Sequence, residues 1–358
     1  MDILQAIILG LIEGITEYIP VSSTGHLILA QKWMGLHGDA NDAYVIVIQG
    51  GAILAVLGLY RKRVKNMIDG LLGKNPAGLK LALNLIVAFL PAAIIGFFLH
   101  STIKAALFKP TPIIAALALG GGVMIYVSRW QRNTYKDNDQ TNRFLDIEAL
   151  TLKGALIIGM LQCIAMWPGT SRSMVTIVAA MAIGMRPKHA AEFSFLLGLP
   201  TLGGAMLFEA YQSRESLVNI DMEAAIIGLA TAFIAASIAI KWLVAYLSKH
   251  GLALFGWYRI ILAILVAIGL WNGYLSLGGN NDESTLGGGE ATSSTYEVST
   301  LKKDHLSPVK AVGMLVNRKF LVATQLTSSI FTGPITDPHC PVIKVASRIL
   351  DRKDHRKP

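Results

Sequence analysis

Long apolar runs constrain this chain more than any other feature of its sequence. Runs such as 79–99, 224–240 with its flanks and 252–271 provide the roughly 20 residues that an α-helix needs to cross a bilayer. Charged residues make up only 15% of the chain, against roughly 25% in soluble domains. Because backbone groups in lipid must be hydrogen-bonded within their own segment, the runs predict transmembrane helices. The sequence therefore predicts an all-α polytopic membrane protein.

Hydropathy divides this protein into two halves with the same order of segments. Each half, at about 1–147 and 148–272, is predicted to hold one interrupted apolar segment followed by three spans. The interrupted segments are at about 3–34 and 151–185. The spans are at about 43–60, 79–100 and 111–129, and then at about 188–209, 223–247 and 252–272.

Short matching sequences relate the two interrupted segments to each other. With a one-residue shift between them, the matching stretches are 10–13 with 159–162 and 20–23 with 168–171. An odd number of spans between the copies makes the second copy enter the membrane from the opposite side. The prediction is an inverted-topology repeat, in which each half is one re-entrant helix-loop-helix plus three transmembrane helices.

Basic residues are concentrated in alternate loops. The richest are 61–78, 130–150 and 186–188, and the positive-inside rule makes these loops cytoplasmic. The chain is then expected in the bacterial inner (plasma) membrane, with its site opening to the periplasmic face and its carboxyl terminus outside. The same loops account for the net charge of +9, so no nucleic-acid partner is predicted.

The composition changes after Trp271. Glycine, serine, threonine, asparagine and charged residues replace the apolar runs, as in 278–281 and 287–289. Residues 1–272 are predicted to form the membrane core, and 273–358 a flexible polar extension to which we assign no function. A lineage-specific extension and altered reading at the end of the gene are both compatible with it.

Two carboxylates in the first interrupted segment need a partner. Glu13 and Glu17 are four residues apart and share one helix face. They repel each other, and each costs about 2.5–3.5 kcal/mol in lipid, so a cation, a shared proton or water must compensate. A divalent cation, Mg²⁺ or Ca²⁺, is the simplest solution. Alternatively, both carboxylates face water near the amino terminus.

Hydroxyl groups and one imidazole follow these carboxylates. Pro20 ends the first helix, and Ser22, Ser23 and Thr24 can cap a second helix whose free amides bind an anion. His26 lies within one turn and is a candidate acid or base for a nucleophilic Ser23 or for water. A histidine at headgroup level is the alternative interpretation.

The second interrupted segment also has a proline break followed by small hydroxyl residues. Arg172 lies between Ser171 and Ser173 in a stretch that is otherwise uncharged. Its planar guanidinium suits bidentate binding of phosphate. Alternatively, the arginine has a structural role in an ion pair, and the candidate partners are Glu13, Glu17 and Glu192. Together, the two segments supply what phosphoryl transfer requires for positioning and for neutralising charge.

These motifs carry a resemblance to a known family. The Glu-x-x-x-Glu run leading into Pro-Val-Ser-Ser-Thr-Gly-His, with the later Pro-Gly-Thr-Ser-Arg-Ser, resembles the undecaprenyl-diphosphatase family associated with bacitracin resistance. The resemblance covers roughly 1–272, and 192–197 also looks familial. This chain has Met174 where the family often has glycine, and it carries the extension that the family core lacks.

The resemblance implies a metal-dependent phosphatase. Such an enzyme converts undecaprenyl diphosphate to the monophosphate and recycles this lipid carrier for peptidoglycan and other envelope polymers. Glu13 and Glu17 would then serve the metal, Ser23 or His26 would be nucleophile or base, and Arg172 would bind phosphate. The residues that would line the site are Ser22, Thr24, Ser171 and Ser173.

Two other function classes are compatible with a polytopic membrane protein. A lipid-phosphate transporter or flippase can be built on the same inverted repeat, and a structural scaffold needs only the spans. Transport requires anion binding but no nucleophile, and a scaffold requires neither polar cluster. The combination of hydroxyl, imidazole, carboxylate and guanidinium groups favours an enzyme. Its predicted partners are a polyprenyl pyrophosphate and membrane lipids, and the surfaces of its spans would suit a homodimer.

Overall fold

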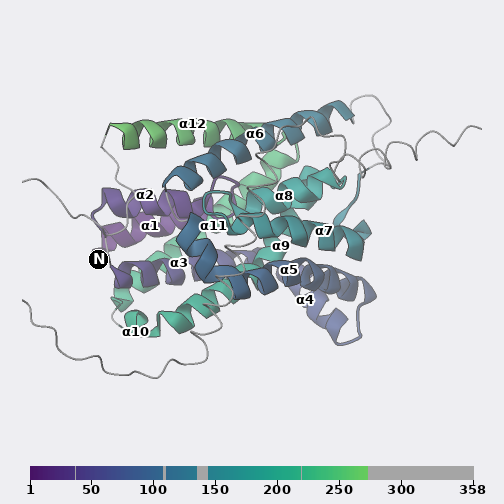
Figure 1. Cartoon of the computed structure of the whole chain (residues 1–358). Helices are drawn as coiled ribbons and strands as arrows, with labels where there is room; N and C mark the ends of the chain where they lie inside the picture. The colour runs from purple at the N-terminus through teal and green to yellow at the C-terminus, as the bar shows by residue number, and fades with distance from the viewer. Residues whose placement is uncertain (37, 108–109, 135–143, 219, 273–358) are drawn as a thin grey trace, which may run out of the picture. The chain divides into compact units, whose positions relative to one another are not determined.

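The described part of the protein is an all-α bundle, as predicted. The computed structural model describes residues 1–272 apart from 37, 108–109, 135–143 and 219. These residues all belong to one unit, Met1–Glu283. Helices account for nearly all of the described backbone in Figure 1. The predicted extension at 273–358 lies outside the described residues.

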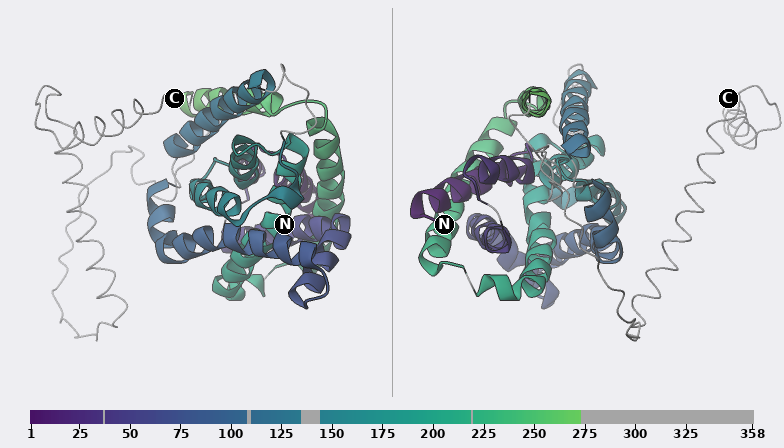
Figure 2. Two further views of the ribbon diagram at one scale, coloured as in Figure 1. Left: turned by 90° about the vertical axis from the view of Figure 1, so that its right-hand side faces the viewer. Right: turned by 60° about the vertical axis from the view of Figure 1, so that its left-hand side comes forward.

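Long apolar helices match the predicted spans. Within the described ranges, six helices are long and apolar enough to cross a membrane, so the protein is a multi-pass membrane protein. They are α3 (Asp39–Leu59), α5 (Pro76–Leu107), α6 (Pro110–Thr134), α9 (Pro187–Gln212), α11 (Met222–Leu247) and α12 (Ala253–Trp271). The last span of the first half, α6, and the last span of the second half, α12, run side by side along one edge of the bundle (Figures 1 and 2).

The two interrupted segments are pairs of short helices. The first pair is α1 (Ile3–Thr16) and α2 (Ser23–Trp33), and the second is α7 (Leu152–Gln162) and α8 (Arg172–Ala182), with the 3-10 turn η2 (Cys163–Met166) after α7. In Figure 1, the first pair lies toward the end of the bundle that holds the amino terminus, and the second lies toward the opposite end.

Glycines allow the first helix of each pair to approach a long helix closely. A Cβ atom on Gly10 of α1 would lie 2.5 Å from the carbonyl oxygen of Gly228 in α11. A Cβ atom on Gly159 of α7 would lie 2.4 Å from the carbonyl oxygen of Ala88 in α5. Both distances are shorter than real Cβ contacts. A side chain at either glycine would therefore push α1 away from α11, or α7 away from α5.

The loops predicted to be cytoplasmic contact one another at one end of the bundle. Arg63 forms ion pairs with Glu148 and with Glu192, the latter at 3.0 Å. The Nε2 atom of Gln131 at the end of α6 donates to the carbonyl oxygen of Met185 at 3.0 Å. These contacts join the three basic loops, and they give Glu192 a partner other than Arg172.

Short helices occupy three stretches that were predicted to be loops. Residues Arg61–Leu71 form α4, residues Ile147–Ala149 form the 3-10 turn η1 and residues Arg214–Leu217 form α10. The loop prediction for 61–71 is wrong because its basic residues alternate with apolar ones at helical spacing. Val64 and Met67 pack against the core, and Arg61 and Lys62 stay exposed.

Candidate active site

The first break separates a carboxylate, Glu17, from the hydroxyl residues that begin the next helix. Glu17 is the C-terminal cap of α1, and the following turn contains Pro20. Ser22 has a positive φ of 78°, and its side chain accepts a hydrogen bond from the amide of Gly25 at 3.4 Å. This cap satisfies one of the free amides at the start of α2, so the helix begins at Ser23.

The second break is closed in the same way. After Gln162 ends α7, Gly169 turns the chain with a φ of 87°. Ser171 then has a φ of 72°, and its side chain accepts a hydrogen bond from the amide of Met174 at 3.3 Å. Arg172 is therefore the first residue of α8, as Ser23 is of α2.

The two breaks correspond without the one-residue shift that the prolines suggested. Both capping serines have positive φ values, and they are as far apart in sequence as the two close-approach glycines. The pairs at this separation are Gly10 and Gly159, Glu13 and Gln162, Ser22 and Ser171, and Ser23 and Arg172. The shift is wrong because the caps, which end each turn, define the register more closely than the prolines inside it.

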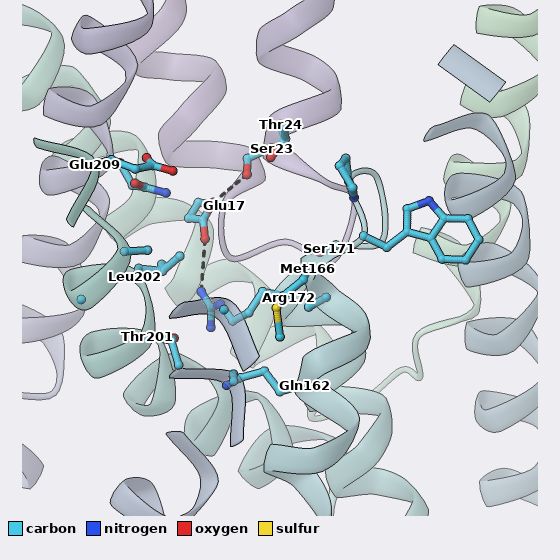
Figure 3. A pocket seen from close by; sticks show the side chains of 18 of the residues that line it. Glu17, Ser23, Thr24, Gln162, Met166, Ser171, Arg172, Thr201, Leu202 and Glu209 are labelled. Carbon is cyan, nitrogen blue, oxygen red and sulfur yellow. Dashed lines mark hydrogen bonds and ion pairs between the residues drawn. The ribbon is translucent and has the colours of Figure 1, made fainter. Parts of the chain in front are cut away.

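A three-residue cluster joins the breaks. The Oγ atom of Ser23 donates to Oε2 of Glu17 at 2.6 Å, and Nη2 of Arg172 donates to Oε1 of the same carboxylate at 3.2 Å (Figure 3). The side chains of Glu17 and Arg172 are 6% and 11% exposed. Among the three carboxylates considered from the sequence, Glu17 is thus the one that pairs with the arginine.

Packing fixes the position of the guanidinium. Nη1 of Arg172 donates to the carbonyl oxygen of Ser194 at 2.8 Å, and Cζ lies 5.6 Å from the centre of the Tyr18 ring. The guanidinium also lies close to Gly198, where an added Cβ atom would be 2.9 Å from Nη1. Arg172 is therefore held by a hydrogen bond, a ring and a glycine as well as by Glu17.

The cluster faces a cavity of about 580 Å³. Six of the predicted site residues line it: Glu17, Ser22, Ser23, Thr24, Ser171 and Arg172. Most of the other lining residues are apolar and come from α5, η2 and α9: Phe89, Ala92, Ala93, Phe97, Met166, Ala205 and Phe208. A cavity lined by both polar and apolar residues suits a ligand that has a charged head and an apolar tail.

Two predicted site residues lie behind the cavity wall. Glu13 is 1% exposed, and its Oε1 atom has no hydrogen-bond partner within the described part of the chain. Ser173 is fully buried, and its Oγ lies 3.0 Å from Oγ of Ser171 and 3.5 Å from the carbonyl oxygen of Ile19. Ser173 therefore ties one break to the other, whereas the Glu13 carboxylate lies one helical turn before Glu17.

His26 has partners outside the cluster. Its Nδ1 atom lies 2.8 Å from the carbonyl oxygen of Ser22, and its Nε2 atom lies 2.7 Å from the hydroxyl of Tyr258. The two rings stack with their centres 5.8 Å apart. The structure thus brings Ser23, Glu17 and Arg172 together but holds this imidazole away from them, and its role as acid or base stays a prediction.

Arg259 is a functional candidate that the sequence reasoning missed. It is fully buried in α12 and donates to backbone carbonyls of both breaks, Gly169 at 2.8 Å, Thr170 at 3.0 Å and Pro20 at 3.5 Å. A further bond of 2.9 Å reaches Ala116 in α6. A charged residue inside an apolar span was the available signal, because such residues are expensive in lipid.

Further polar residues line the cavity without having been predicted. They are Gln49, Gln162, Thr201 and Glu209. Gln162 is 2% exposed, and it occupies the position in α7 that Glu13 occupies in α1. That correspondence, a polar residue at the end of an apolar helix, was the signal that could have found it.

Known proteins match most of this chain. The family model described as bacitracin resistance protein BacA matches residues 6–265. An undecaprenyl-diphosphatase of Sorangium cellulosum is 45% identical over 269 residues, which cover 75% of this chain and 85% of that protein. Undecaprenyl-diphosphatase 2 of Rhodospirillum rubrum is 41% identical over 276 residues, covering 76% of this chain and 97% of that protein.

A third relative extends the comparison. An undecaprenyl-diphosphatase of Acinetobacter baumannii is 40% identical over 267 residues, which cover 75% of this chain and 95% of that protein. The family match reaches from α1 into α12 and so includes both breaks and the Ser23, Glu17 and Arg172 cluster. This chain belongs to the bacitracin resistance protein BacA family.

Proposed function

We propose that this protein hydrolyses undecaprenyl diphosphate to undecaprenyl phosphate and inorganic phosphate. This reaction recycles the lipid carrier for peptidoglycan and envelope polymers and makes the cell resistant to bacitracin. The observation that carries the proposal is the cluster of Ser23, Glu17 and Arg172 in a cavity whose other lining is mostly apolar. The names of the three relatives agree with it.

Ser23 is the nucleophile in this proposal. Its Oγ forms a bond to the terminal phosphorus, the bond from that phosphorus to the bridging oxygen breaks, and polyprenyl monophosphate leaves. The proton of Ser23 passes to Glu17, which already accepts a hydrogen bond from it at 2.6 Å. Water then hydrolyses the phosphoserine to inorganic phosphate and restores the hydroxyl. Arg172 neutralises negative charge on the phosphates throughout.

A divalent cation fits the two carboxylates when substrate oxygens complete its shell. The described residues contain no group of three or more His, Cys, Asp or Glu side chains that could hold a metal without other ligands. Mg²⁺ is commonly bound by one or two carboxylates together with substrate phosphates. The buried Oε1 of Glu13 has no described partner, as expected of an atom that awaits a ligand. We propose that Glu13 and Glu17 hold Mg²⁺ or Ca²⁺, which would neutralise the diphosphate.

The membrane arrangement extends the proposal. The order of segments in each half, the two capping serines and the packing of α1 on α11 and of α7 on α5 support an inverted-topology repeat. The charge asymmetry of the loops supports placement in the bacterial inner membrane, with the cavity opening to the periplasmic face and the carboxyl terminus outside. A homodimer stays a prediction. Transport alone is not favoured, because it needs no hydroxyl activated by a carboxylate.

Phosphate release from a polyprenyl diphosphate in detergent tests the function. The wild type is compared with Glu17→Ala and Arg172→Ala, each with and without a chelator. We expect release that depends on a divalent cation and falls by at least about 100-fold in both variants, as is usual when charge-stabilising groups are removed. A folded wild type that binds the lipid but releases no phosphate would instead identify a transporter.

A further inference from the structure

We propose that Gln162 is a substrate-binding residue whose side-chain amide hydrogen-bonds to the diphosphate group in the cavity. This inference rests on the phosphatase function proposed above and adds a ligand contact from the second half of the chain. The observation that carries it is that the side-chain amide of Gln162 is buried, lines the cavity and has no hydrogen-bond partner among the described residues.

The amide of Gln162 is buried without hydrogen bonds. The side chain is 2% exposed, and neither Nε2 nor Oε1 has a partner among the residues that the structure describes. Burying an amide without partners destabilises a fold, so native proteins rarely leave both atoms unsatisfied. The partners are therefore expected to come from what fills the cavity.

Two other buried side-chain amides differ from Gln162 because they form hydrogen bonds within the protein. The Nε2 atom of Gln131 donates to the carbonyl oxygen of Met185 at 3.0 Å, and Nδ2 of Asn84 donates to that of Leu150 at 3.0 Å. Each of these amides joins two segments of the chain. Gln162 joins none of the described segments in this way, although it is as deeply buried.

The position of Gln162 is suited to a diphosphate. It lines the same cavity as Glu17, Ser23 and Arg172, and in Figure 3 it lies beyond Arg172 from Ser23, with its amide toward the side where Thr201 lies. Glu17 bonds to Ser23 and Arg172, and it forms no hydrogen bond with the amide. A diphosphate is long enough to offer one phosphate to Ser23 and oxygens of the other to a second donor.

The chemistry of the amide also matches this ligand. Nε2 supplies two N–H donors for phosphate oxygens, and Oε1 can accept from a protonated phosphate oxygen. An acidic residue, Glu13, holds the equivalent position in the first half. A carboxylate at position 162 would repel the diphosphate, whereas a neutral amide binds it without adding negative charge.

Gln162→Met tests the proposal, because methionine has a similar length and no polar atoms. Removing an unsatisfied buried amide should leave the thermal midpoint of the ligand-free protein unchanged or raise it. The kcat/KM for a polyprenyl diphosphate should fall by about 10-fold to 100-fold, since a donor to the substrate is lost. Gln162→Glu should lower kcat/KM further through repulsion.

Gln131→Met is the matched control. It removes a buried amide that makes a structural hydrogen bond, so it should lower the thermal midpoint and leave KM unchanged. If Gln162→Met instead loses stability as the control does and keeps its kcat/KM, Gln162 is structural and the proposal is wrong.

Binding of a non-hydrolysable methylene diphosphonate analogue of the prenyl substrate separates this inference from the proposed function. Wild type that binds the analogue about 10-fold more tightly than Gln162→Met supports the contact, even if phosphate release from the wild type fails. Equal binding by the two proteins overturns it, even if the wild type is an active phosphatase.

Discussion

Alanine at Gly198 should disable the site while leaving the fold in place. The added Cβ would lie 2.9 Å from Nη1 and 3.0 Å from Nη2 of Arg172, whereas ordinary contacts begin at 3.4 Å. The guanidinium must therefore move by about 0.5 Å, and its bond to Glu17 is already 3.2 Å long. Because a misplacement of about 1 Å can cost 10²-fold in rate, we expect kcat/KM to fall by about 10-fold to 100-fold, or roughly 1.4–2.7 kcal/mol.

The effect on stability should be small. A glycine-to-alanine change inside a helix gains about 1 kcal/mol in helix propensity, and overpacking costs about 1–3 kcal/mol. These contributions partly cancel, so Gly198→Ala should fold. Arg172, at the far end of a long side chain, can give way.

Gly203→Ala is the control, because it lies in the same helix and its Cβ would meet nothing within 4 Å. Phosphate release is measured for both variants at several substrate concentrations, together with thermal unfolding in detergent. Gly203→Ala should keep wild-type kcat/KM. A folded Gly198→Ala protein with kcat/KM within about twofold of wild type would refute the reasoning, since that difference is under 0.5 kcal/mol. So would an equal loss in the control.

Two further perturbations follow from the cluster and from the buried arginine. Ser23→Ala should lower kcat by at least about 1,000-fold and abolish a labelled phosphoenzyme trapped by acid quenching, because it removes the proposed nucleophile; turnover near the wild-type rate would show that water attacks directly. Arg259→Met should destabilise the fold by about 3–5 kcal/mol in chemical denaturation, because it leaves buried carbonyls of both breaks without donors. Arg259→Lys should restore part of that loss. A wild-type denaturation midpoint in Arg259→Met would show that the bonds from Arg259 to the two breaks do not stabilise the fold.

Hydropathy and proline breaks were sufficient to predict the spans and the two interrupted segments. The requirement that lipid-exposed backbone be helical leaves few alternatives for runs of this length. The amphipathic helix α4 was missed because its charged residues also suit a loop, and only packing of Val64 and Met67 shows that it is a helix. Long apolar runs therefore predict the spans more reliably than a mixed pattern of charged and apolar residues predicts a short helix such as α4.

The sequence indicated which polar residues would come together, but not all of their partners. Motif order indicated that Ser23, Glu17 and Arg172 would meet, and the structure brings them within hydrogen-bond distance. His26 was grouped with Ser23 because they are three residues apart, yet its ring turns toward Tyr258 from a distant helix. Sequence proximity could not reveal that competing partner. Arg259 likewise acts on backbone carbonyls, which leave no pattern in the side-chain sequence.

Under the proposed mechanism, the two breaks share the tasks of binding and attacking a phosphate. Corresponding positions carry Glu13 and Gln162 in the last turns of α1 and α7, and Ser23 and Arg172 at the starts of α2 and α8. The first half would then contribute a carboxyl group and a hydroxyl, which suit a metal and nucleophilic attack. The second half contributes an amide and a cation, which suit binding of an anionic substrate. Two halves with identical residues would supply either four repelling carboxylates or no nucleophile, so the proposed mechanism requires divergence at these positions.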